Sequence, residues 1–190
     1  MTGGIGSGKS AALETFRRLG AAVMSSDDVV HRCYRDPTLV AQVRERFGDT
    51  VVSSDGSVDR VALGALVFDD AAARGALERL IHPRIQAARE AWIAEQRAAD
   101  PSPPLLVCEV PLLFEVGLAD RFDAVLVVTA SDDVRRARVA ARGQDFASRA
   151  AQQMAESEKV RLADHAYVND GSLQALESWV QERFREYSGS

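Results

Sequence analysis

Near the start of the chain stands the stretch Gly3-Gly4-Ile5-Gly6-Ser7-Gly8-Lys9-Ser10. It matches the pattern in which two glycines enclose four residues and are followed by lysine and a hydroxyl residue. Glycines at these places let backbone N–H groups converge on phosphate oxygens, because no Cβ atom stands in the way. The pattern therefore predicts a phosphate-binding loop (P-loop, or Walker A motif), with Lys9 on the β- and γ-phosphates and Ser10 on Mg²⁺.

The segment after the loop fits the same prediction. Residues 9–19 place Ala12, Leu13 and Phe16 on one face, which is typical of an amphipathic helix, and Gly20 suits its C-terminal end. A helix N-terminus adds a dipole that favours bound anions. We therefore expect ATP or another nucleoside triphosphate to bind here with magnesium.

The strand that should precede such a loop is too short. A P-loop follows a buried strand of about five residues, whereas only Met1 and Thr2 precede Gly3. Loss of that central strand would leave backbone groups of its neighbours unpaired in the core. We expect that the natural sequence continues upstream of Met1, that the chain has been shortened, or that the protein is compromised.

Apolar runs alternate with helical patterns along the rest of the chain. This alternation predicts an α/β fold with a parallel sheet flanked by helices. Residues 30–102 hold no strand pattern and are interpreted as a helical insertion, and residues 135–156 as a second, arginine-rich insertion. Strands are predicted at residues 21–25, 105–110, 124–129 and 166–168, and helices at 37–47, in two pieces over 59–81, from Pro83 onward, and at 172–187.

Composition narrows the class of protein. The 190 residues are 46% hydrophobic and 27% charged, as in ordinary globular proteins, and the net charge of −5 argues against a nucleic-acid binder. No apolar run reaches the roughly 20 residues of a membrane span, and no signal peptide is recognisable. Cys33 and Cys108 lack metal or redox spacing, so a reduced, cytoplasmic protein is expected.

Two later segments are far more specific than the P-loop alone: Val110-Pro111-Leu112-Leu113-Phe114-Glu115 and Leu80-Ile81-His82-Pro83-Arg84-Ile85. Together with the P-loop they resemble the dephospho-CoA kinase family. The resemblance covers residues 2 to about 172. The other matching residues are Leu19-Gly20, 23–27, Asp55-Gly56-Ser57-Val58-Asp59-Arg60, Val67-Phe68, Gly117-Leu118, Arg138, Arg142, Arg149, Gln153, Lys159, Ala163-Asp164 and Asn169.

The resemblance implies an activity and a three-part architecture. Members of the family transfer the γ-phosphate of ATP to the ribose 3′-hydroxyl of dephospho-CoA, which completes coenzyme A synthesis. The implied parts are a P-loop core that lacks its first strand (residues 1–29, 103–135 and 157–190), a helical CoA-side domain (30–102) and an arginine-rich lid (136–156). We expect a monomer or a weak homo-oligomer.

The resemblance places the catalytic aspartate at Asp27. This residue follows a predicted strand, at the edge where open α/β sheets bind ligands. A carboxylate there can accept the proton of an attacking hydroxyl or hold a magnesium-bound water; the alternative is a helix N-cap. Ser25 departs from the family, which usually has a second aspartate there. Asp28 is shifted by one residue, so we expect it to point elsewhere and not to replace that aspartate. Glu109 is a candidate second acid near the metal.

Five arginines lie between positions 135 and 149. Arg138 and Arg142, four residues apart, share one helix face, and their planar guanidinium groups suit phosphate oxygens. We predict that Arg138 is catalytic, that Arg142 binds ATP and that Arg149 binds the substrate. The alternative is a solvated basic helix.

The remaining predicted site residues come mainly from the resemblance. It implies that His82, Leu112, Leu113, Phe114 and Glu115 line the dephospho-CoA site. It also implies that Asn169 contacts adenine. A histidine at a helix start, core packing of the apolar residues and turn formation at Asn169 are the structural alternatives. Two other functions stay open: another P-loop small-molecule kinase, and a non-catalytic nucleotide-binding protein descended from a kinase.

Overall fold

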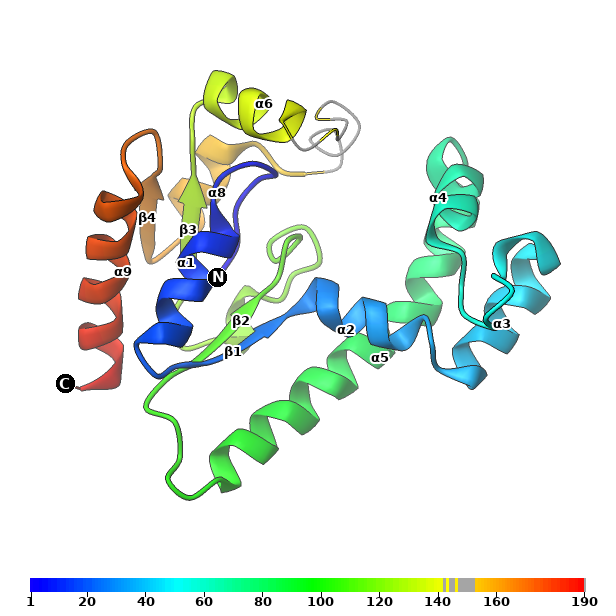
Figure 1. Cartoon of the computed structure of the whole chain (residues 1–190), viewed down its shortest axis with the longest axis horizontal. Helices are drawn as coiled ribbons and strands as arrows, with labels where there is room; N and C mark the ends of the chain where they lie inside the picture. The colour runs from blue at the N-terminus through cyan, green and yellow to red at the C-terminus, as the bar shows by residue number, and fades with distance from the viewer. Residues whose placement is uncertain (142, 144–145, 147–152, 190) are drawn as a thin grey trace. The chain divides into compact units, whose positions relative to one another are not determined.

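The computed structural model of the chain describes residues 1–190 except 142, 144–145, 147–152 and 190 (Figure 1). Its contacts divide the chain into two compact units. The first unit comprises Met1–Met24 and Ala99–Ser190, and the second comprises Ser25–Ala98. No helix in the described part of the chain combines the length and the apolarity needed to span a membrane.

Four short strands confirm the predicted α/β class. β3 pairs in parallel with β4, with Leu126 opposite His165 and Thr129 opposite Val168. β1 is the neighbour of β2 in a second pair. Each predicted strand is found within two residues of its expected ends: β1 is Ala22–Ser25, β2 is Leu106–Glu109, β3 is Leu126–Thr129 and β4 is His165–Val168.

Met1 and Thr2 lie between β2 and β3. The amino group of Met1 donates to the carbonyl oxygen of Cys108 (2.7 Å), and the Thr2 N–H donates to the carbonyl oxygen of Leu126 (2.8 Å). Both residues are buried, and burial lowers the pKa of the amino group to about 6. Met1 and Thr2 thus make hydrogen bonds at the place where a strand of about five residues was expected, and the P-loop follows them directly.

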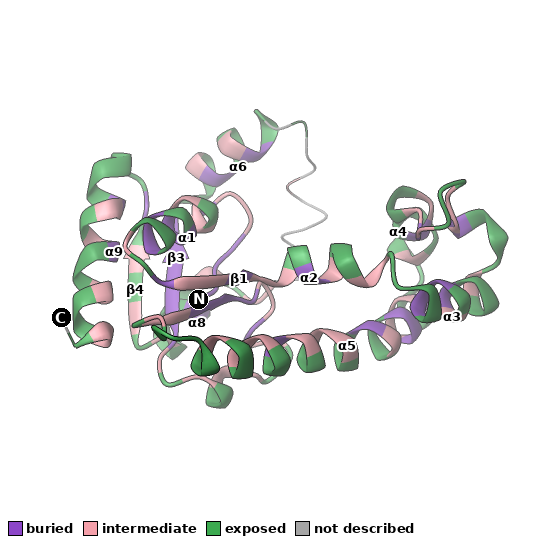
Figure 2. Cartoon of the chain, turned by 60° about the horizontal axis from the view of Figure 1, so that its bottom comes forward, coloured by how far each residue is buried: buried purple, intermediate pink, exposed green. Residues whose placement is uncertain are grey.

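Helices pack around these strands in the first unit. α1 runs beside α9 (Figure 1), and β3 is buried along its whole length (Figure 2). Phe16 of α1 and Leu176 of α9 are fully buried in the shared core, so the apolar helix faces read from the sequence meet there. The helices in the described part of this unit are α1 (Lys9–Arg18), η2 (Ala119–Arg121), α6 (Asp132–Ala140), α8 (Glu156–Leu162) and α9 (Leu173–Ser188).

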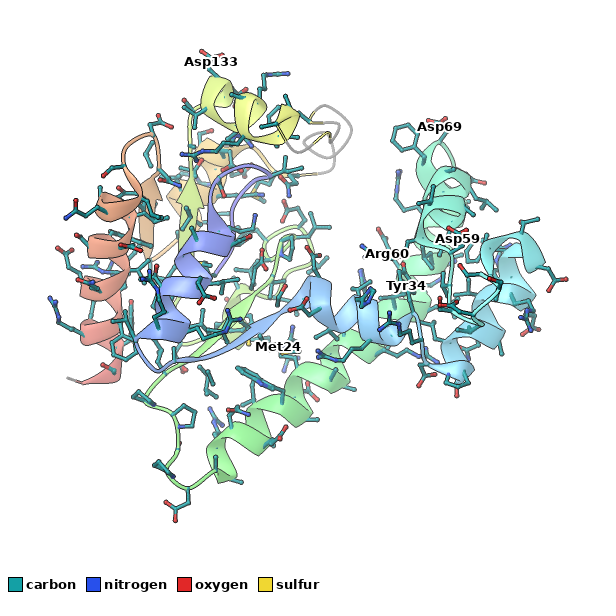
Figure 3. All side chains as sticks on the ribbon, in the orientation of Figure 1. Met24, Tyr34, Asp59, Arg60, Asp69 and Asp133 are labelled. Carbon is teal, nitrogen blue, oxygen red and sulfur yellow. The ribbon has the colours of Figure 1, made fainter. Side chains whose placement is uncertain are left out.

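The second unit is helical. Its core gathers Leu39, Val43, Leu63 and other apolar side chains from several helices. Three of these helices begin at aspartate caps, which are Asp36 before α3, Asp59 before α4 and Asp70 before α5. Asp59 lies next to Arg60 at the start of α4 (Figure 3). The elements are α2 (Ser26–Cys33), α3 (Pro37–Phe47), η1 (Asp49–Val51), α4 (Arg60–Phe68) and α5 (Ala71–Ala98).

The prediction that Pro83 opens a new helix is wrong, because Pro83 lies inside α5. Proline removes one helical hydrogen bond and normally bends or ends a helix. Here Arg84 Nη1 donates to the carbonyl oxygen of Leu80 (2.8 Å), which supplies a donor next to the interruption. Buried Leu77 and Ile81 hold the same helix face in the core. Tertiary packing therefore keeps the helix continuous.

Candidate functional site

The P-loop conformation requires glycine at particular places. Gly3, Gly6 and Gly8 have φ values of 144°, 78° and 104°, which L-residues with a side chain rarely adopt. A Cβ atom on Gly3 would lie 1.9 Å from the carbonyl oxygen of Val128, and one on Gly8 would lie 2.2 Å from Nδ2 of Asn169. The glycines therefore serve both backbone geometry and close packing.

Lys9 folds back over this loop. Its Nζ atom donates to the carbonyl oxygens of Gly3 (2.9 Å) and Gly4 (3.0 Å). The same Nζ lies 4.0 Å from Oε1 of Glu109, at the end of β2. Ser10 is exposed in the first turn of α1. The C-terminal end of the loop thus offers the Lys9 ammonium group and the Ser10 hydroxyl group, and the buried carboxylate of Glu109 faces Lys9.

Arg138 and Asn169 hold the other end. Arg138 Nη1 lies 3.4 Å from the carbonyl oxygen of Gly6 and 3.5 Å from that of Ser7, and Nη2 donates to the carbonyl oxygen of Asn169 (3.0 Å). The Asn169 side chain donates from Nδ2 to the carbonyl oxygen of Ser7 (2.8 Å). Two predicted site residues from distant segments therefore meet on the loop.

Backbone N–H groups of the loop also bind side chains that the sequence did not single out as functional. The Gly4 N–H donates to Glu156 Oε2 (3.3 Å), and the Ile5 N–H donates to Gln153 Oε1 (3.2 Å). Glu156 begins α8, and Gln153 lies just before it. Gln153 was part of the family resemblance without a role, so that match was the only signal for it.

A charged network continues inward from Glu156. Lys159, fully buried, has its Nζ atom 3.2 Å from Glu115 Oε1 and 3.7 Å from Glu156 Oε1. Arg135, whose side chain is also buried, pairs with Asp132 (2.6 Å) and lies 4.0 Å from Glu156. The hydrogen bond from Arg135 lowers the pKa of the Asp132 carboxyl group. The sequence alone gives Arg135 no role, because most arginines on helices are solvated.

The loop after β2 carries the predicted acceptor-side residues. Leu113 is buried at 1% exposure, whereas Leu112 and Phe114 are half-buried. Glu115 Oε1 accepts the N–H of Met154 (2.7 Å) and faces Lys159. The other oxygen, Oε2, is buried and receives no donor within the described residues. One oxygen of Glu115 thus holds a backbone N–H group, and the other is enclosed by the protein.

Other predicted site residues belong to the second unit or fall outside the described residues. Asp27 is exposed in the first turn of α2, beside Asp28, and His82 is exposed on α5. Arg142 and Arg149 lie outside the described residues. Among those described, no three His, Cys, Asp or Glu side chains are grouped so that they could hold a metal ion.

Comparison with known proteins identifies similar sequences. A family model described as dephospho-CoA kinase (CoaE) matches residues 1–175. A protein named dephospho-CoA kinase from Mesorhizobium japonicum is 41% identical, covering 100% of this chain and 95% of that protein. Another with this name, from Symbiobacterium thermophilum, is 39% identical over 100% of this chain and 80% of its own length.

Solved structures show the same fold. The protein TT1252 from Thermus thermophilus matches with a TM-score of 0.83 and 34% identity, covering 97% of this chain and 94% of that one. A dephospho-CoA kinase from Campylobacter jejuni matches with a TM-score of 0.66 over 100% of this chain and 97% of its own. Its identity is 20%, so this second match supports the fold alone.

Proposed function

Since the chain belongs to the dephospho-CoA kinase family, we propose how its own residues carry out the reaction of that family. The enzyme phosphorylates dephospho-CoA with ATP, giving coenzyme A and ADP. The γ-phosphoryl group moves to the ribose 3′-hydroxyl oxygen, and the hydroxyl proton is released. Phosphoryl transfer needs little covalent chemistry from a protein, so positioning and charge neutralisation are its main tasks.

The proposal for the ATP side rests on one observation: Lys9 and Arg138 both donate to carbonyl oxygens of the P-loop. Carbonyl oxygens are weaker partners for cations than phosphate oxygens are. We expect bound ATP to draw both side chains from the loop onto its phosphates. Gly3 to Ser10 would surround the β-phosphate, with Arg142 assisting and Asn169 near adenine.

The residues at the loop fit a magnesium ion. Mg²⁺ prefers oxygen ligands and is usually held by one or two protein oxygens together with substrate phosphates. The hydroxyl group of Ser10 is the proposed ligand, and the carboxylate of Glu109 is suited to a magnesium-bound water. When bound, the ion would neutralise charge that develops on the phosphates.

Asp27 is the proposed catalytic residue on the acceptor side. Its exposed carboxylate would orient the ribose hydroxyl and accept its proton. For binding dephospho-CoA we propose His82, Arg149 and the loop after β2. In that loop the half-buried Leu112, Phe114 and Glu115 would contact the substrate, whereas Leu113 is buried.

An acceptor screen tests this function. The purified protein is incubated with ATP and Mg²⁺ and with dephospho-CoA, shikimate or nucleosides, and each product is identified by mass and phosphate position. Transfer to dephospho-CoA alone supports the proposal. Transfer only to another acceptor favours a different small-molecule kinase, and ATP binding without turnover favours a non-catalytic protein. A cytoplasmic location and a monomeric or weakly associated state stay predictions.

A further inference from the structure

Lys159 stands apart from the other cationic residues of the chain. Of the 23 lysine and arginine residues only Lys9 and Lys159 are lysines, and Lys159 is fully buried. Burying an ammonium group is costly unless anions compensate it. An apolar side chain of similar length would avoid that cost only if the carboxylates of Glu115 and Glu156 were replaced as well. The charge at this position therefore needs an explanation beyond packing.

The two carboxylates that face Lys159 both hold backbone N–H groups. Glu156 Oε1 lies 3.7 Å from Nζ, while Oε2 of the same group accepts the Gly4 N–H at 3.3 Å. Glu115 Oε1 lies 3.2 Å from Nζ and accepts the Met154 N–H at 2.7 Å. One buried cation thus links the first half of the P-loop, the segment before α8 and the loop after β2.

Electrostatics makes these contacts dependent on the lysine. The side chains of Glu115 and Glu156 are only 17% and 16% exposed, so both carboxylates need a counter-charge close by. Nη1 of Arg135 lies 4.0 Å from Oε1 of Glu156. The same guanidinium group also pairs with Asp132, so it compensates the charge of Glu156 only in part. Without Lys159 the two carboxylates would repel each other. The charged Glu156 would then turn toward solvent, which would break its hydrogen bond with the Gly4 N–H.

We propose that Lys159 is a positioning residue of the kinase, which fixes the P-loop through Glu156 and the acceptor-side loop through Glu115. It does not touch ATP in this arrangement, because its side chain has no exposed surface. ATP affinity depends on its charge, since Gly4 must be held for the loop to present its N–H groups to phosphate. The inference rests on the proposed ATP site.

The first experiment measures ATP binding by calorimetry in the absence of dephospho-CoA, below the unfolding temperature of each variant. Lys159→Met, which keeps length but removes charge, should weaken ATP binding at least tenfold. Arg161→Met is the matched control, because Arg161 lies on the same helix with a side chain that is 71% exposed. The control should bind ATP like the wild type. Unchanged affinity in folded Lys159→Met overturns the proposal.

A second substitution separates positioning from general destabilisation. Glu156→Gln retains an oxygen that can accept the Gly4 N–H but removes the charge that needs Lys159. In the Lys159→Met background, Glu156→Gln should therefore restore much of the lost ATP affinity. If Lys159 were purely structural, the losses of ATP affinity in Lys159→Met and in Glu156→Gln would add in the double variant. Additive losses in ATP affinity would overturn the proposal even if Lys159→Met binds ATP poorly.

A third measurement uses the unaltered protein. With isotope-labelled lysine the chain gives only two lysine side-chain signals, and the signal that disappears in Lys9→Arg belongs to Lys9. Titration with MgATP should shift the Lys159 signal with the same midpoint as the Lys9 signal. A Lys159 signal that stays fixed while Lys9 responds would overturn the coupling. If wild-type protein phosphorylates dephospho-CoA in that case, the proposed function survives and only this inference fails.

Discussion

Replacing Gly8 by alanine should disable the P-loop. Gly8 has φ 104° and ψ 14°, and it precedes α1. In this left-handed region a side chain costs about 1–2 kcal/mol. The new Cβ atom would lie 2.2 Å from Nδ2 of Asn169, so the Asn169 amide must move. That movement breaks the 2.8 Å hydrogen bond to the buried carbonyl oxygen of Ser7, at a further cost of about 1–3 kcal/mol.

These two contributions set the expected loss of ATP affinity. Together they disfavour the native loop conformation by about 2–5 kcal/mol. If ATP binds only that conformation, its affinity falls by up to the same free energy, which is about 1.5 to 3.5 powers of ten. Calorimetric titration of Gly8→Ala with MgATP measures this loss, and thermal unfolding measures the accompanying destabilisation.

Gly20→Ala is the matched control. Gly20 has a similar φ of 96°, but a Cβ atom there meets nothing within 4 Å. It should lower the free energy of unfolding by about 1–2 kcal/mol and leave ATP affinity unchanged. Adding Asn169→Ala removes the obstacle, so Gly8→Ala should lose less affinity in that background. Wild-type ATP affinity in Gly8→Ala would mean that the P-loop tolerates a side chain at this position.

Three further predictions concern activity and stability. Lys9→Ala and Asp27→Ala should each lower kcat/KM for phosphoryl transfer by about 10²–10³, because each removes a group that stabilises the transition state. Arg138→Ala should lower turnover far more than it lowers the thermal unfolding midpoint. The Leu39 N–H holds the pKa of the Asp36 carboxyl group below its usual range. The charged cap therefore stabilises the fold at pH values above the unfolded pKa of about 4, and this stabilisation is lost as the pH falls and the carboxylate takes up a proton. Asp36→Asn, which caps without titrating, should therefore lose less stability than the wild type between about pH 5 and pH 3.

Each of these predictions has a result that contradicts it. Near-normal turnover of Asp27→Ala would remove that residue from its catalytic role, and the same holds for Lys9→Ala. If Arg138→Ala loses stability in proportion to activity, its bonds to the loop are structural. Parallel acid unfolding of the wild type and Asp36→Asn would mean that the cap at Asp36 does not contribute to the pH dependence.

Local patterns in the sequence predicted much of this fold. The spacing of glycines around Lys9 identified the P-loop, and the apolar runs located all four strands. Pro83 was misjudged because the local rule for proline does not include the contacts of Arg84 and of the buried residues beside it. Local sequence describes the intrinsic preference of a segment, whereas tertiary packing decides whether that preference is obeyed.

The network around Lys159 could not be predicted in the same way. Gly4 and Glu156 are 152 residues apart in the sequence, and Glu115 and Met154 are 39 apart. Nothing local marks a lysine on a short helix as buried, since lysine is normally exposed. Arg138 and Asn169 were predicted as site residues, but their hydrogen bonds to the P-loop needed the structure.

The most direct test of the account follows phosphate from ATP to dephospho-CoA. Wild-type protein, MgATP and dephospho-CoA are incubated, and ADP and the phosphorylated product are quantified together with the position of the new phosphate. We expect one ADP for each coenzyme A formed, with the phosphate on the ribose 3′-oxygen. We also expect Lys9→Ala to reduce both products together. Formation of ADP without coenzyme A, or a phosphate at another position, would show that the protein does not catalyse this transfer.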